Sequence, residues 1–140
     1  MFFRRLACLI ALLPTSAMAL TTAPDSCTPR DFGDFLTEFT AAGAPQARST
    51  ADMVTFEALD PAAEPEPAMQ STQTPKDQLT WPVMPALTDL MSQGLEVRID
   101  TSAPNGAAVV ARGADNGTHL TWVFDLTPCW QLTKVIDASL

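Results

Sequence analysis

The chain has 140 residues, with sixteen acidic side chains against eight basic ones and a net charge of −8. This balance excludes a nucleic-acid-binding protein, because too few cationic side chains are present to neutralise phosphates. The length suits one domain rather than two.

Residues 1–19 have the features of a secretory signal. Arg4 and Arg5 precede an apolar run over residues 6–13, and Ala17-Met18-Ala19 is a small-residue cleavage site. The apolar run is much shorter than the roughly 20 residues that a spanning helix needs. We therefore expect cleavage after Ala19, one domain over residues 20–140, no membrane span in the mature chain, and a periplasmic or secreted bacterial protein. The mature chain keeps six basic and sixteen acidic side chains, a net charge of −10.

Cleavage also removes Cys8 and leaves Cys27 and Cys129. In an oxidising compartment, two cysteines without a competitor are expected to form a disulfide. The predicted bridge encloses 101 residues, a loop for which the chain-entropy model gives roughly 4–5 kcal/mol of stabilisation. The wide spacing differs from the C-x-x-C pattern of redox pairs, so the bridge is predicted to be structural.

Residues 28–41 predict the clearest helix. Thr28 is a candidate N-cap, Pro29 suits the first helical position, and Gly43 is a stop signal. Apolar side chains then recur with helical spacing on one face, at Phe32, Phe35, Leu36 and Phe39.

The middle of the chain is less regular. Residues 45–52 could form a second short helix, and residues 53–59 alternate as a strand does. Residues 60–75 are rich in proline and poor in apolar side chains, which predicts an extended, partly mobile loop. A polyproline docking segment is a second interpretation, but it lacks a basic or aromatic anchor. Residues 86–91 predict a short helix that ends at Gly94.

The last third of the chain predicts four antiparallel strands. Residues 95–100 alternate strictly, Asn105-Gly106 and Asn116-Gly117 are hairpin signals, and residues 130–137 form the final strand, whose register the pattern leaves open.

Turn lengths set the expected registers of the two hairpins. A two-residue turn at Asn116-Gly117 places Val109 opposite Phe124, Ala111 opposite Trp122 and Arg112 opposite Thr121. A three-residue loop in the first hairpin places Thr101 opposite Ala111 and Asp100 opposite Arg112. The predicted fold class is therefore α+β, with N-terminal helices packed on a curved antiparallel β-sheet that ends in a four-stranded meander.

Three segments resemble a known group of proteins: the phenylalanine-rich residues 32–39, Gln46-Ala47-Arg48, and the ending from Pro128-Cys129-Trp130 to Leu140. They resemble small exported bacterial proteins of uncharacterised function related to the nuclear-transport-factor-2-like (cystatin-like) superfamily. The sequence departs from that pattern at Pro45 and in its proline-rich loop. The resemblance implies a conical α+β roll with a pocket between helix and sheet. Because the superfamily contains isomerases, dehydratases, cyclases and non-catalytic modules, it does not select a function.

No residue pattern for catalysis, a metal or a cofactor is present. The single histidine, His119, lies on the outward face of its predicted strand without a partner to orient it, and we interpret it as a surface residue. Zinc, calcium, phosphate-loop and nucleophile-elbow patterns are missing from the sequence. Five aromatic side chains are candidate pocket-lining residues, although core packing is the favoured explanation for the tryptophans: Phe35, Phe39, Trp81, Trp122 and Trp130.

The sequence thus favours a non-catalytic exported domain that binds a protein or a small ligand in the cell envelope. The alternative is a pocket enzyme of the isomerase or cyclase type, which needs a carboxylate base whose pKa is raised by burial. The candidate bases are Asp52, Glu57, Asp100 and Asp125. A homodimer packed through its sheets is a third hypothesis.

Overall fold

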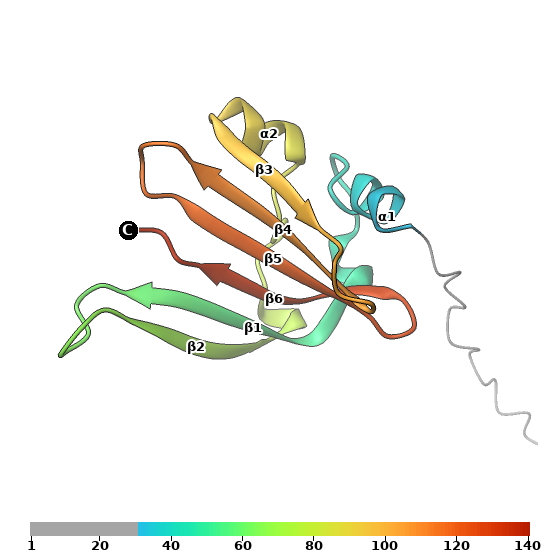
Figure 1. Cartoon of the computed structure of the whole chain (residues 1–140). Helices are drawn as coiled ribbons and strands as arrows, with labels where there is room; N and C mark the ends of the chain where they lie inside the picture. The colour runs from blue at the N-terminus through green and yellow to red at the C-terminus, as the bar shows by residue number, and fades with distance from the viewer. Residues whose placement is uncertain (1–30) are drawn as a thin grey trace, which may run out of the picture.

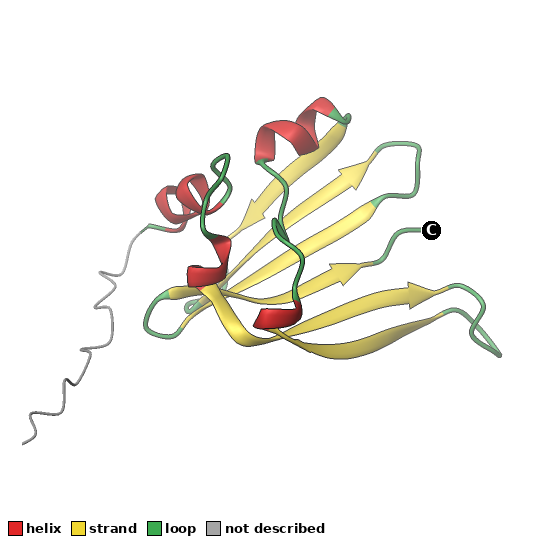
Figure 2. Ribbon diagram, turned by 180° about the vertical axis from the view of Figure 1, so that it is seen from behind, coloured by secondary structure: helices red, strands yellow, loops and turns green. Residues whose placement is uncertain are grey.

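Six strands form one twisted sheet, and the helices lie on one of its faces (Figures 1 and 2). The structure is a computed structural model and describes residues 31–140. The strand order across the sheet is β2-β1-β6-β5-β4-β3. The strands are β1 (Thr50–Asp60), β2 (Ala68–Pro75), β3 (Leu95–Asp100), β4 (Gly106–Gly113), β5 (His119–Leu126) and β6 (Trp130–Asp137).

Helix α1 (Phe32–Phe39) begins later than predicted. Asp31 has an extended backbone, and its carboxylate accepts hydrogen bonds from the backbone N–H groups of Gly33 at 2.8 Å and Asp34 at 3.4 Å. Asp31 is therefore the N-cap, since an extended residue ends the helical hydrogen-bond pattern. The predicted cap at Thr28 was wrong for this helix, and residues 28–30 lie outside the described residues.

The other helical elements are short. Helix α2 (Leu87–Ser92) matches the expected helix and is followed by Gly94, whose φ of +79° suits a glycine after a helix C-terminus. The second predicted helix is a single 3-10 turn, η1 (Gln46–Ser49), because strand β1 already begins at Thr50. A further turn, η2 (Lys76–Gln78), follows β2.

Residues 60–75 are not the predicted loop. Only residues 61–67 form the connection, and β2 pairs antiparallel with β1 from Ala68 opposite Asp60 to Pro75 opposite Met53. The prediction failed because it required apolar side chains for packing. An edge strand gains its stability from backbone hydrogen bonds to its neighbour, so exposed Ser, Thr and Gln side chains are tolerated there.

The sheet is mixed rather than entirely antiparallel. Strand β1 pairs in parallel with β6, whereas all other neighbouring strands are antiparallel. The predicted antiparallel sheet was wrong at this junction. Two strands also precede α2, so the helices are not confined to the N-terminal part of the chain.

Both hairpins have longer connections than predicted. In the structure Val109 lies opposite Trp122 and Arg112 opposite His119, two positions away from the expected partners. In the first hairpin Asp100 lies opposite Ala108, four positions away. Because side chains alternate with a period of two, shifts of two or four residues leave each side chain on its expected face.

Strand β6 contains a bulge at Thr133. Val123 lies opposite Lys134 and Phe124 opposite Leu132, which leaves Thr133 without an opposite residue. An extra residue reverses the alternation. Leu132 before the bulge is buried in the core and Val135 after it packs against the same core. This phase change explains why both faces of the strand looked partly apolar in the sequence.

The core lies between the sheet and the helices. Phe124 is fully buried at its centre, with ring centroids 5.3 Å from Phe32, 5.6 Å from Phe35 and 5.2 Å from Phe39. The predicted apolar stripe of α1 is thus fully buried against β5. The space between this helix and the sheet is filled by aromatic side chains.

Candidate functional site

Gln46 fastens the segment over residues 81–86 across the helix-bearing face of the sheet. Its side-chain Nε2 donates to the Met84 carbonyl at 2.8 Å, and its Oε1 accepts from the backbone N–H groups of Val83 at 3.0 Å and Met84 at 3.1 Å. Trp122 completes the attachment, because its indole N–H donates to the Val83 carbonyl at 3.2 Å. Figure 2 shows this segment running in front of the sheet.

Two hollows flank Gln46. The first, of about 230 Å³, lies between α1 and η1 and is lined by Phe35, Phe39, Gln46 and Arg48, with Glu38 and Ser49 at its polar side. Arg48 is exposed, and its guanidinium makes no hydrogen bond or ion pair with another described residue. A cation therefore stands beside an aromatic wall.

The second hollow, of about 370 Å³, lies on the other side of Gln46. Its wall consists of small and apolar residues from the α1–η1 connection and the 81–86 segment, with Asp89 as the single charged group among its lining residues. Trp81 lines this hollow and is 37% exposed. Ala44 lines both hollows, so they meet along one short wall.

The five aromatic candidates separate into two groups. Phe35 and Phe39 line the first hollow and Trp81 the second, so the structure brings these three together around Gln46. Trp122 is only 2% exposed and belongs to the core. Trp130 is half-buried against Phe32, with ring centroids 4.9 Å apart.

The four candidate bases all lie away from these hollows. Asp52 is exposed and pairs with Lys76 at 3.0 Å, and Glu57 pairs with Lys134 at 2.9 Å. Asp100 is exposed, and hydrogen bonds from Ser102 hold the pKa of its carboxyl below the ordinary value of 3.8. A base for proton abstraction needs the opposite shift.

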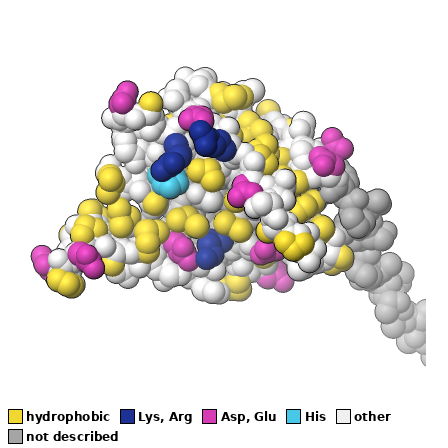
Figure 3. Space-filling model, in the orientation of Figure 1, with side chains coloured by type: hydrophobic (Ala, Val, Ile, Leu, Met, Phe, Trp, Pro, Cys, Tyr) yellow, Lys and Arg dark blue, Asp and Glu magenta, His cyan; other side chains and the backbone are white. Residues whose placement is uncertain are grey.

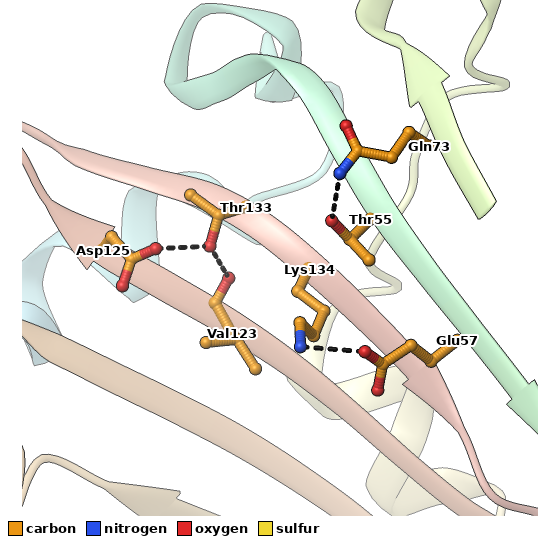
Figure 4. Close-up of polar contacts among 7 residues, drawn as sticks. All are labelled: Thr55, Glu57, Gln73, Val123, Asp125, Thr133 and Lys134. Atoms are coloured by element: carbon orange, nitrogen blue, oxygen red, sulfur yellow. Dashed lines mark hydrogen bonds and ion pairs between the residues drawn. The ribbon is translucent and has the colours of Figure 1, made fainter. Parts of the chain in front are cut away.

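Asp125 is the fourth candidate and belongs to a polar network on the open face of the sheet. Thr133 Oγ1 donates to Asp125 Oδ2 at 2.7 Å and lies 3.4 Å from the Val123 carbonyl (Figure 4). The bulge makes this contact available, since it turns Thr133 and Lys134 toward the same face. None of the four carboxylates is buried in an apolar cavity, which is the condition that the enzyme hypothesis required.

Among residues 31–140, no cluster of three or more His, Cys, Asp or Glu side chains could hold a metal ion. No helix in the same range is long and apolar enough to cross a membrane. Cys27 lies outside the described residues, so its pairing with Cys129 stays a prediction, as does the signal over residues 1–19.

The fold is that of the nuclear-transport-factor-2-like proteins. The chain superposes on the crystal structure of an NTF2-like protein from Bacteroides fragilis with a TM-score of 0.57 at 19% sequence identity. The match covers 83% of this chain and 50% of that protein, so the chain spans half of its length. No protein-family model and no curated protein sequence matches the chain. The resemblance expected from residues 32–39, 46–48 and 128–140 is confirmed at the level of the fold.

The sequence includes Gln46 in a segment that resembles the nuclear-transport-factor-2-like superfamily, but it predicted no contact for this side chain. Its partners are 37 and 38 residues away along the chain. The residues around Gln46 carry no local signal that its side chain is buried, which the structure shows. Its partners could not be identified without the path of the 81–86 segment.

Proposed function

We propose that this protein is an exported, non-catalytic domain that binds a small, largely apolar ligand in the cell envelope, using the two hollows beside Gln46. One observation supports this function above the others. Aromatic and small apolar side chains form much of the walls of the hollows, with Glu38, Arg48 and Asp89 as their charged residues, and the candidate carboxylates for catalysis all lie elsewhere.

The chemistry of the walls suggests the ligand class. Pockets for small molecules are mostly apolar and contain a few polar groups that orient the ligand. Here Phe35, Phe39 and Trp81 supply aromatic surface, and Arg48 offers a cation at one end. An apolar molecule with an acidic or polar end would match this distribution.

Export is proposed from the sequence. The first nineteen residues have the order of a secretory signal. The strongly acidic mature chain would be repelled by anionic lipid headgroups, which favours a protein free in the compartment over one held at the membrane surface. A homodimer through the open sheet face also stays a proposal, and native mass spectrometry of the purified protein measures it directly.

The test uses the neutral fluorescent probe N-phenyl-1-naphthylamine with the mature protein. We expect saturable binding that quenches tryptophan emission, since Trp81 lies in the second hollow. Ala44→Phe places a ring in the wall shared by both hollows and should abolish this binding. Ala114→Phe, an identical change at an exposed position on a loop of the opposite face, should leave it intact.

Two results would count against the proposal. Probe binding that is not saturable, or that survives Ala44→Phe in a variant whose unfolding is unchanged, would remove these hollows as a binding site. Native mass spectrometry of protein taken from the periplasm gives an independent measurement, because a bound ligand adds mass that is released on activation.

A further inference from the structure

A basic patch lies on the open face of the sheet, in a chain that is otherwise strongly acidic. The patch consists of Arg98 on β3, Arg112 on β4 and His119 on β5. Figure 3 shows dark blue cationic side chains gathered beside the histidine on this face. Since the chain carries a net charge of −8, such a concentration of cations is a local feature that composition does not predict.

Strand register places three of the charged or titratable side chains in one row. Arg112 lies directly opposite Glu96 on β3 and directly opposite His119 on β5. Side chains that face each other across strands have Cβ atoms about 4.5–5.5 Å apart. One small group can therefore contact both Arg112 and His119.

Arg98 neutralises the charge of Glu96, the acidic residue in this row. Its Nη2 lies 2.7 Å and its Nε 2.8 Å from Glu96 Oε1. Glu96 is thus already paired, and neither the guanidinium of Arg112 nor the ring of His119 has a hydrogen bond or ion pair with another residue in the range 31–140. The guanidinium of Arg112 and the imidazole of His119 therefore lie next to each other on the open face.

These two side chains line a hollow of about 440 Å³. One wall is the β4–β5 loop and the other is the C-terminal segment, which is held by hydrogen bonds from Ala138 N to the His119 carbonyl at 2.9 Å and from Leu140 N to the Gly117 carbonyl at 3.1 Å. Gly117 has a φ of +70°, and a Cβ added there would lie 2.9 Å from the Leu140 carbonyl oxygen. Glycine at this position lets the two walls approach each other.

We propose that this hollow binds the oxyanion of a small molecule, a phosphate or a carboxylate group, between Arg112 and His119. A guanidinium presents a planar fork of donors that matches two oxygens of either group, and the imidazole supplies a further N–H. Glu96 also lines the hollow, but its carboxylate is paired with Arg98. Asp115 in the adjoining loop and Asp137 at the end of β6 do not line it. The site lies on the opposite face from the hollows beside Gln46, so it is independent of the proposed apolar ligand.

The experiment uses the imidazole of His119 as a reporter. His119 is the single histidine of the sequence, so the ring signals in the NMR spectrum of the untagged mature protein belong to it alone. Inorganic phosphate and, separately, sodium acetate are titrated at fixed neutral pH, with ionic strength held constant by chloride. Saturable shifts of the ring signals with either anion support the site, and the stronger of the two anions identifies its preferred group.

Two matched variants decide where the anion binds. Arg112→Gln should weaken binding by about tenfold or more, because it removes a charge-assisted hydrogen-bonding partner. Lys76→Gln removes the same charge at η2, at a residue that pairs with Asp52 and lines none of the hollows described above, and should leave binding unchanged. Ring signals that stay constant with both anions, or equal losses in Arg112→Gln and Lys76→Gln, would overturn the proposal.

Discussion

Gln46 and Met84, 38 residues apart in the chain, are joined by two hydrogen bonds in which the glutamine side chain pairs with both backbone polar groups of the methionine. Both residues are buried, and Met84 is fully so. The arrangement copies the pairing of two backbone segments, with a side-chain amide in place of one of them. It satisfies polar groups that the short 3-10 turn and the irregular 81–86 segment could not satisfy with each other.

Gln46→Ala is predicted to lower the free energy of unfolding by about 2–4 kcal/mol. The substitution removes the partner of the buried N–H and carbonyl of Met84 and of the part-buried N–H of Val83. Each buried group left unpaired costs about 1–3 kcal/mol. Urea unfolding followed by tryptophan fluorescence measures the change. Gln70→Ala, on the exposed edge strand β2, is the control and should change stability little. A loss below 1 kcal/mol for Gln46→Ala would contradict the structural role given to this side chain.

Phe124→Ala is predicted to lower stability by about 3–5 kcal/mol, since a fully buried ring at the centre of an aromatic cluster leaves a cavity that its neighbours cannot fill. The same unfolding measurement applies. Phe56→Ala serves as the comparison, because Phe56 on β1 is only half-buried and should cost less. Equal losses at the two positions would argue against the core described here.

Thr133→Val tests the bulge of β6. Valine keeps the shape of threonine but cannot donate to Asp125, so we expect a loss of about 1 kcal/mol, the usual net value of one hydrogen bond. Thr72→Val on the edge strand is the control, since Thr72 is exposed and lies opposite Phe56 across the ladder. If the two variants were equally stable, the contact between Thr133 and Asp125 would contribute nothing measurable.

The Asp100 carboxyl is predicted to titrate below its ordinary range, because Ser102 donates hydrogen bonds to the charged form. A pKa that is lower in the folded state means that the associated stability is present above the unfolded pKa and is lost as the pH falls through the folded pKa. Carboxyl-detected NMR should show the pKa of Asp100 rising toward 3.8 in Ser102→Ala and staying low in Ser71→Ala. No difference between these two variants would refute the assignment.

Intact mass spectrometry tests the signal and the disulfide together. Protein recovered from the periplasm is predicted to begin at Leu20 and to weigh two hydrogen atoms less than its reduced form, because of a Cys27–Cys129 bridge. Cys129→Ser should restore a free thiol at Cys27 and lower stability by roughly 4–5 kcal/mol on the chain-entropy model. Cys8→Ser is the control and should leave the mature mass unchanged. A mature chain with two free thiols would show the bridge to be wrong.

The amino-acid pattern was sufficient to predict the helices and strands whose periodicity is visible within their own residues. The apolar stripe of α1, the alternation of β3 and the bounds of β6 follow from periodicities that each segment carries in its own residues. The sheet face of each hairpin residue was also predicted correctly although the register was wrong, as His119 shows. Its hairpin is displaced by two positions, yet its ring still lies on the open face beside Arg112, because an even displacement preserves the alternation.

Other features depended on partners far away in the chain. Strand β2 has no apolar face and forms because its backbone pairs with β1 through hydrogen bonds. The parallel pairing of β1 with β6 joins the first strand to the last. The candidate site has the same origin, since neither the contacts of Gln46 nor the row of Glu96, Arg112 and His119 can be derived without knowing turn lengths and chain path. Local periodicity thus determined the helical and extended segments that carry an apolar face of their own. Tertiary structure alone decided which residues meet, because hydrogen-bond ladders and turn lengths select among registers that the side-chain pattern leaves equivalent.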